Sequence, residues 1–221
     1  MQAPKTRKDE KDRRGLLLVV GALLALALVG GGVAAWWFLV RDDATATENV
    51  EQAMTRAGCE LEVVEALASS EHIEDPDAEP EEWNTFPPTS GPHYGQWVIW
   101  GEYDDPVRLA EAVHNLEHGG IVMYYGENVP DEEVAALRRF YRDDPVAMLM
   151  APLPRLDDRI ALTAWHAPRA EEGTEDARYQ DAEGVLARCE SVDADAFRVF
   201  RDTYRFQGPE RIPPENLQPG M

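Results

Sequence analysis

The sequence PVRLAEAVHNLEHGGIVMYY, residues 106–125, predicts a helix, a sharp stop and a buried strand in one continuous run. Pro106 suits the first position of a helix, which we expect to continue to His118. Two consecutive glycines then end the helix, and the apolar residues 121–125 follow as a strand. This helix and strand are the starting point for the rest of the expected domain.

Periodic segments on both sides of this run predict the remaining elements. We expect helices at 48–57, 131–142 and 193–204, and strands at 61–64, 147–150 and 160–165. This order predicts an α+β domain, residues 48–206, with a single small mixed sheet and flanking helices. It is compatible with a thioredoxin-like order, although no Cys-x-x-Cys motif accompanies it. The proline-rich residues 207–221 are expected to form a disordered tail.

The N-terminal residues predict a membrane anchor. A basic tail, residues 1–14, precedes residues 15–40, which carry no charge and are long enough to span a bilayer. A signal peptide has a shorter apolar region of about 7–15 residues, so we favour an uncleaved transmembrane helix, with cleavage near Ala44 as the alternative. Positive charge before the span predicts a cytoplasmic N-terminus. The domain after the 41–47 linker is then expected outside the cell membrane, on a single-pass protein.

The chain is strongly acidic. Its net charge is −21, and residues 1–14 carry six basic and three acidic side chains, so the remaining residues carry −24. Such a charge disfavours nucleic acid and anionic lipid surfaces as partners. It would concentrate cations near the protein, or it serves only to keep an exported domain soluble. No protein partner follows from the composition.

Two cysteines, Cys59 and Cys189, lie near the two ends of the expected domain. Disulfides persist outside the cytoplasm, so we expect these two residues to be bonded, with two unrelated free thiols as the alternative. Closing so long a loop stabilises a domain by about 4–5 kcal/mol in the chain-entropy model. The bond would clamp both ends of one domain.

Three of the five histidines lie within a short stretch, which indicates a metal site. On a helix, His114, Glu117 and His118 project from roughly one face. Two imidazoles at this spacing can chelate one ion, while Glu117 can bind the ion, accept a ring N–H or act as a general base. The alternative is that histidines near a helix C-terminus only suit the helix dipole.

Further ligands are expected in the long segment 68–105, because structureless loops of this length usually bind or cover something. His93 follows a proline-stiffened loop and is the expected third ligand, with His72 as a weaker fourth. Residues expected to support the site are Thr89, Ser90, Gly91, Pro92 and Asn115.

The donor types suit copper or zinc. Imidazole binds both ions, and thioether sulfur from Met123, Met148 or Met150 could add a soft ligand for Cu(I). All three methionines lie in expected strands, so we favour a core position for them. The ion is expected to be the cofactor of a binding protein, an interpretation that we favour over an enzyme.

Two alternatives remain for these residues. His114-x-x-Glu117-His118 matches the inverted zinc-protease pattern, which would make the protein a zinc-dependent hydrolase with Glu117 as its base. The immediate stop at Gly119 counts against a peptidase, since that motif lies inside a longer helix. The second alternative is an envelope interaction module without metal, in which the histidines form a buried hydrogen-bond network.

Two longer motifs carry a resemblance to a known family. WNTFPPTSGPH at 83–93 and VHNLEHGG at 113–120 resemble an uncharacterised bacterial family, domain of unknown function three-one-zero-five. The resemblance implies one N-terminal span, a histidine before the loop, here His72, and a late tryptophan, here Trp165. This chain departs from the pattern with Trp83 in place of a tyrosine and His166 in place of a glycine, so no role passes to His166. The resemblance implies no activity.

Overall fold

The computed structural model describes residues 50–67, 72–75, 83–167 and 179–221. The chain divides into two units, residues 1–47 and 48–221, and only the second is described. The expected cytoplasmic tail, transmembrane helix and linker lie outside the described residues. Among the helices that are described, none is both long and apolar enough to cross a membrane.

The second unit contains strands, α-helices and short 3-10 turns in mixed order. Its strands are β1 (Glu60–Glu65), β2 (His72–Ile73), β3 (His93–Tyr94), β4 (Ile121–Tyr125), β5 (Met148–Pro152), β6 (Ile160–His166) and β7 (Glu183–Cys189). Its helical elements are residues 50–56, α2 (Leu109–Glu117), α3 (Asp131–Asp143), η1 (Pro154–Leu156), α4 (Ala194–Tyr204) and η3 (Pro214–Asn216).

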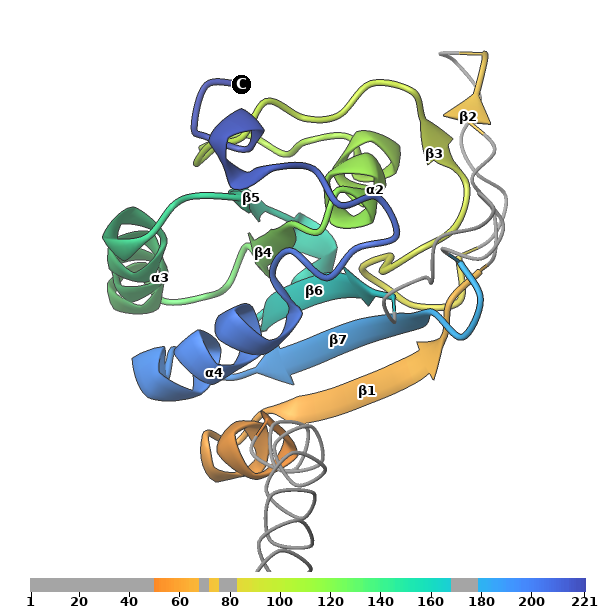
Figure 1. Ribbon diagram of the computed structural model, residues 1–221. Helices are drawn as coiled ribbons and strands as arrows, with labels where there is room; N and C mark the ends of the chain where they lie inside the picture. Colours follow the sequence, from red (N-terminus) through yellow and green to blue (C-terminus); the bar gives the residue numbers. More distant parts are fainter. Residues whose placement is uncertain (1–49, 68–71, 76–82, 168–178) are drawn as a thin grey trace, which may run out of the picture. The chain divides into compact units, whose positions relative to one another are not determined.

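These elements form an α+β fold around a mixed sheet, as the sequence predicts (Figure 1). The five-stranded sheet has the order β1-β7-β6-β4-β5. Strands β4 and β5 run parallel, and every other neighbouring pair in this sheet is antiparallel. The sheet is not the only one among the described residues, because β2 and β3 form a separate parallel pair. That pair was not expected, and it carries two of the candidate ligands.

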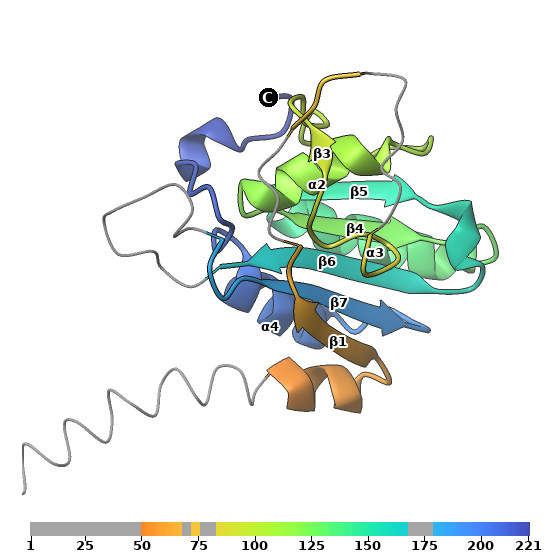
Figure 2. The same cartoon turned by 90° about the vertical axis from the view of Figure 1, so that its right-hand side faces the viewer.

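Two hydrophobic cores lie on opposite faces of the sheet. Along β4, Ile121 and Met123 face one core while Val122 and Tyr124 face the other, which is the alternation of a strand buried on both sides. Residues 50–56, α3 and α4 cover the first face, and α2 with the loops before it covers the second (Figures 1 and 2). The candidate ligands on α2 therefore lie on the face opposite α3 and α4.

The three methionines considered as ligands belong to the first core. Met123, Met148 and Met150 are fully buried among the residues that pack under α3 and α4. They lie on the other face of the sheet from α2, so the preferred interpretation as core residues is confirmed.

Strand β7 is a further element that the sequence analysis missed. Val185, Leu186 and Ala187 at its centre are fully buried, and β7 pairs with β1 on one side and β6 on the other. Glycine and alanine have low strand propensity, so the sequence GVLA gives no clear strand period. The long-range pairing with two neighbouring strands outweighs this weak local preference.

Helix α2 begins later than expected. Its first residue is Leu109, with Arg108 in an extended conformation before it, so Pro106 is not the first helical residue. Farther upstream the chain runs along β5, where Glu102 bridges Met150 and the Tyr103 N–H donates to the Met150 carbonyl. The helix can turn only after it leaves this strand edge. The glycine stop after His118 is as predicted.

The other expected elements lie within one or two residues of their predicted bounds. Helix α3 starts with three acidic residues in its first turn, where they stabilise the positive end of the helix dipole. Helix α4 starts after Asp193, whose carboxylate accepts hydrogen bonds from the N–H groups of Asp195 and Ala196.

The expectation of a disordered tail at residues 207–221 is wrong. Leu217 is buried, and its carbonyl accepts a hydrogen bond of 2.8 Å from the Ala147 N–H. The Trp100 N–H donates to the Met221 carbonyl, and the Gly220 N–H donates to the Trp100 carbonyl. The prolines limit helix and strand formation in this tail, but they do not prevent it from packing on the domain.

Cys59 and Cys189 form the expected disulfide, at a sequence separation of 130. Cys59 directly precedes β1 and Cys189 ends β7, and these two strands pair along their whole length. The bond therefore links the start of the edge strand β1 to the end of its neighbour β7.

Candidate metal centre

Five polar side chains meet where the end of α2 faces the β2–β3 pair. His72 and His93 are register partners on β2 and β3. His114 and Glu117 lie on the last turn of α2, and His118 is its C-cap. The His114 ring lies 5.1 Å from the His72 ring and 5.0 Å from the His93 ring, measured between centroids. We call these five residues the histidine cluster.

The loop before His93 is held rigidly. Thr89 and Ser90 are fully buried, and the Ser90 hydroxyl oxygen accepts a hydrogen bond of 3.0 Å from the Leu67 N–H. Gly91 has a φ of +104°, and a Cβ there would lie 2.9 Å from the Leu67 side chain, so only glycine fits. These contacts explain why small residues precede His93 and why its backbone position is well defined.

Two backbone carbonyls orient the buried imidazoles. The Nδ1–H of His93 donates to the Gly91 carbonyl at 2.8 Å, and the Nδ1–H of His114 donates to the Tyr94 carbonyl at 2.7 Å. Because a carbonyl can only accept, each Nδ1 carries the proton and the Nε2 atom of each ring faces the centre of the cluster. Metal-binding histidines are usually held in this way by their second nitrogen.

Glu117 is buried between a histidine and a tyrosine. Its Oε2 atom lies 3.0 Å from Nε2 of His93, and its Oε1 atom accepts a hydrogen bond of 2.6 Å from the Tyr179 hydroxyl. The side chain is only 2 % exposed. Tyr179 was missed by the sequence analysis because it lies outside both motifs and far along the chain, and no local pattern marks it.

The charges of this pair stabilise each other in the protein without metal. Burial by itself lowers the pKa of His93, but the hydrogen bond and the charge of Glu117 outweigh it and raise that pKa above 6.5. Burial likewise raises the pKa of Glu117, and the hydrogen bond and charge of His93 outweigh it and lower that pKa below 4.5. When His93 is protonated, its Nε2–H donates to the carboxylate.

His118 lies on the other side of His114. The two Nε2 atoms are 3.0 Å apart, and since His114 carries its proton on Nδ1, the Nε2–H of His118 is the donor. Nε2 of His118 also lies 3.5 Å from Oε2 of Glu210. Burial, followed by the neighbouring His114, lowers the pKa of His118 to about 4. A neutral imidazole is the form that binds metal ions.

The donor atoms fall into two overlapping groups. In the first, one ligand atom from each of His72, His93, His114 and Glu117 lies within 4.8 Å of every other. In the second, Glu117 and His118 meet the same limit together with Glu210. The sequence analysis ranked His118 above His72, whereas the structure places His72 with His93 and His114. Glu210 was missed because it belongs to the tail that was expected to be disordered.

The remaining residues of the second motif shape the surroundings of the cluster. The Asn115 amide pairs with the backbone of Val98 in both directions, at 2.9 and 2.8 Å. Gly119 has a φ of +81°, which ends α2, and a Cβ at Gly120 would overlap the Trp100 ring. The supporting role expected for Asn115 is thus to hold the loop that carries Trp97.

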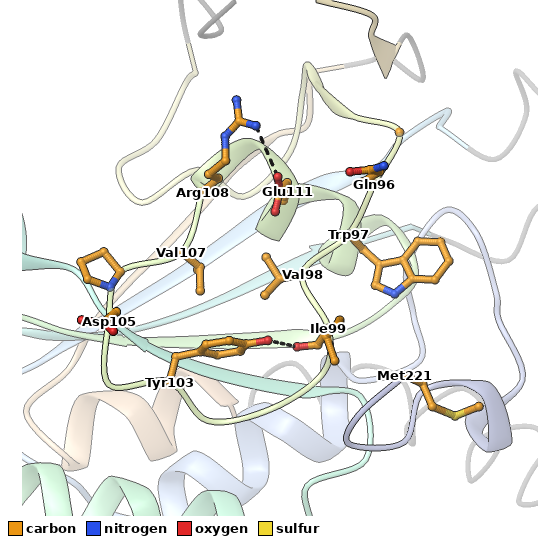
Figure 3. Close-up of a pocket in the computed structure, with 12 residues that line it drawn as sticks. Gln96, Trp97, Val98, Ile99, Tyr103, Asp105, Val107, Arg108, Glu111 and Met221 are labelled. Carbon is orange, nitrogen blue, oxygen red and sulfur yellow. Dashed lines mark hydrogen bonds and ion pairs between the residues drawn. The ribbon is translucent and has the colours of Figure 1, made fainter. Parts of the chain in front are cut away.

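A groove of about 660 Å³ lies beside the cluster and is lined largely by apolar side chains (Figure 3). Trp97, Ile99 and Met221 line it and are each at least 45 % exposed. The Trp97 ring also lies 5.6 Å from the His114 ring and 5.3 Å from the His118 ring. Trp97 therefore separates the groove from the histidines.

The other residues that were compared with the family pattern, Trp83, Trp165 and His166, have clear positions. The indole N–H of Trp83 donates to the Pro92 carbonyl at 3.2 Å, so this residue also supports the loop before His93. The Trp165 ring packs edge-on against His93 with 6.1 Å between centroids. His166 lies 3.2 Å from Glu183 and belongs to neither group of candidate ligands.

Comparison with known families matches residues 76–216 to the family described as Protein of unknown function (DUF3105). This is the family that the two motifs indicated, and the identification is confirmed. No curated protein and no solved structure matches the chain.

Proposed function

We propose that this chain, which belongs to the DUF3105 family of proteins of unknown function, binds a transition-metal ion, copper or zinc, in the histidine cluster. His72, His93, His114 and Glu117 supply the ligands. Three imidazoles and one carboxylate match the donors that both ions accept.

One observation carries this proposal. His93 and His114 both tie their Nδ1–H groups to backbone carbonyls and turn their Nε2 atoms towards the same carboxylate, at 3.0 and 4.0 Å. Ligand nitrogens around a tetrahedral zinc lie about 3.3 Å apart, given Zn–N bonds of about 2.0 Å. Small side-chain shifts bring these donors to that spacing.

The proposal places the site outside the cell membrane. The uncharged segment 15–40 and the basic residues before it support a single-pass anchor with a cytoplasmic N-terminus. The disulfide between Cys59 and Cys189 supports an oxidising compartment for the domain. A protease-protection assay on membrane vesicles of the producing cell tests this part of the proposal.

We also retain the thioredoxin-like order as a proposal for the fold. The order β7-β6-β4-β5, with parallel β4 and β5 and antiparallel β6 and β7, supports it. Thiol exchange is not part of the proposal, because both cysteines are joined across the β1–β7 edge. An experimental structure tests the order.

A zinc-dependent hydrolase is the second candidate, and the groove beside Trp97 is the observation that favours it. A groove of this kind can hold a substrate next to a metal. Glu117 is less suited to be the base, since both of its oxygens already have partners, His93 and Tyr179. The variant Glu117→Gln separates the two roles of this residue. If Glu117 is only a general base, the variant keeps the metal; if Glu117 is a ligand, the variant loses it.

The third candidate is the interaction module without metal. Its support is the continuous network from the Gly91 carbonyl through His93 and Glu117 to Tyr179, in which each polar group has a partner. The hydrogen bonds of this network need no ion, so metal content is the property that separates this candidate from the other two.

Elemental analysis of the full chain tests the proposal. The chain is purified without a histidine tag or chelator, and the variants His114→Ala and His166→Ala are treated identically. We expect near-stoichiometric copper or zinc in the wild type and in His166→Ala, with loss in His114→Ala. Equal metal content in both variants, or a folded wild type that takes up no copper or zinc, contradicts the proposal.

A further inference from the structure

We infer that the cluster holds two cations, the second bound by Glu117, His118 and Glu210, with the Glu117 carboxylate shared between them. This inference rests on the proposed function, because the first ion is the one proposed there. It adds a second ion and a bridging ligand, and it gives the end of α2 and the tail a common role.

The first argument is the number of donors. A tetrahedral ion takes four ligands, and His72, His93, His114 and Glu117 already supply them. His118 lies outside this group, although its Nε2 atom is 3.0 Å from Nε2 of His114. The described residues thus offer more converging donors than one tetrahedral ion uses.

The second argument is the position of the shared carboxylate. Oε2 of Glu117 lies 3.0 Å from Nε2 of His93 and 4.0 Å from Nε2 of His114, and the same side chain belongs to the group with His118 and Glu210. An ionised carboxylate has about four lone-pair sites, so Oε1 can keep its hydrogen bond from Tyr179 and still bind an ion. Protein sites with two metals hold their ions about 3.5–4 Å apart.

The third argument is that Glu210 is held in place by backbone contacts with the end of α2. The Glu210 N–H donates to the Glu117 carbonyl at 2.9 Å, and the Phe206 N–H donates to the Gly119 carbonyl at 2.7 Å. A Cβ at Gly208 would overlap the backbone of Glu117 and Gly119, so the tail approaches the helix end as closely as backbone can. Glu210 is therefore positioned by a built contact and is not an independent surface carboxylate.

The two sites differ in their donors and in their access to water. Three imidazoles and one carboxylate surround the first ion, whereas the second has one imidazole and two carboxylates. Oxygen-rich sites suit harder divalent ions. The Glu210 side chain is 34 % exposed, whereas His93 is fully buried. The second ion is therefore a divalent cation that binds more weakly and is removed first by a chelator, and Zn²⁺, which also accepts carboxylate oxygen, can serve as its probe.

Metal stoichiometry of the full chain tests the inference, with Zn²⁺ as the probe. Wild type, Glu210→Gln and Glu183→Gln are loaded with excess Zn²⁺, desalted and analysed for zinc per chain. Glu183 is a matched control, because it lies 3.2 Å from His166 in a histidine–carboxylate pair outside the cluster. We expect two ions in the wild type and in Glu183→Gln, and one in Glu210→Gln.

The outcomes separate the inference from the proposed function. A wild type that binds one Zn²⁺ overturns the second site and leaves the proposed function intact, and so does a Glu210→Gln variant that binds two ions as tightly as the wild type. A wild type without any bound ion overturns both. Circular dichroism of each variant confirms folding before its metal content is compared.

A spectroscopic readout tests the bridge itself. In the wild type loaded with Cu²⁺, two ions that share a carboxylate couple magnetically and reduce the electron paramagnetic resonance signal per copper. Glu210→Gln should restore the full signal of an isolated Cu²⁺ ion, with one copper per chain. Full, uncoupled signals from two coppers in the wild type would overturn the shared role of Glu117.

Discussion

Nε2 of His93 lies 3.0 Å from Oε2 of Glu117, although 24 residues separate the two in the sequence. Both side chains are almost completely buried, at 0 and 2 % exposure. With His93 protonated, this contact is a buried ion pair. A metal ion on Nε2 of His93 would take the place of its proton, so the same geometry serves both states.

Glu117→Gln should destabilise the metal-free protein by about 3 kcal/mol, because it leaves the His93 imidazolium buried without its partner. The pKa of His93 is raised by folding, so its contribution is complete below pH 6.5 and is lost as the pH rises through the raised pKa. The pKa of Glu117 is lowered, so its contribution is complete above pH 4.5 and is lost as the pH falls through the lowered pKa. The difference in free energy of unfolding between the wild type and Glu117→Gln should therefore be largest between pH 4.5 and 6.5. Urea unfolding across this range measures it, and a pH-independent difference contradicts the ion pair.

His118 should titrate with a pKa of about 4 in the metal-free protein, because burial and His114 disfavour its charged form. Its unfolded pKa is near 6.5, so below that pH the unfolded chain binds a proton that the folded chain does not. Stability should therefore fall as the pH decreases from 6.5 to about 4, and His118→Gln should reduce this loss. NMR titration of the ring protons measures the pKa, and an ordinary value near 6.5 would show that His118 is not buried in solution.

Reduction of the disulfide between Cys59 and Cys189 should lower the free energy of unfolding by about 5 kcal/mol in the chain-entropy model, because the two bonded residues are 130 positions apart in the sequence. Urea unfolding with and without a reducing agent measures the difference. The double variant Cys59→Ser, Cys189→Ser is the control, and the reducing agent should leave its unfolding unchanged. A wild type that is insensitive to reduction would contradict a bond that stabilises the domain.

Gly120→Ala should destabilise the protein by about 1–3 kcal/mol through overpacking. The added Cβ would overlap the Trp100 ring, which is 1 % exposed and cannot move away easily. Gly101→Ala is the matched control, because its Cβ would make only ordinary contacts at 3.6 Å or more and should change stability by about 0.5 kcal/mol or less. Thermal unfolding of both variants provides the comparison, and equal midpoints would contradict the close packing of Gly120 on Trp100.

The elements around α2 could be predicted because their signals are local. Helix period, consecutive glycines and an apolar β-rich run all lie within residues 106–125, and neighbouring residues need no distant partner to express them. His114, Glu117 and His118 share one helix face for the same reason. The helix start was wrong by three residues, since the chain still pairs with Met150 of β5 at Glu102 and Arg108 is extended directly before the helix.

Strand β7 and the ordered tail could not be predicted, because both depend on contacts between residues far apart in the sequence. Strand β7 exists because β1 and β6 pair with it on both sides, and its own sequence has little strand preference. The tail packs because Leu217 and Met221 meet Ala147 and Trp100. Such contacts leave no periodic signal in the tail itself.

The sequence alone determined the α+β class, the disulfide and the helix that carries three of the candidate ligands, because helix period, glycine stops and cysteine count act locally or by composition. Only the tertiary structure decided which donors converge. It brought His72 beside His93 through β2–β3 pairing, Tyr179 onto Glu117, and Glu210 beside His118. A ligand set is a set of distances between distant parts of the chain, and those distances exist only once the sheet and the tail have packed.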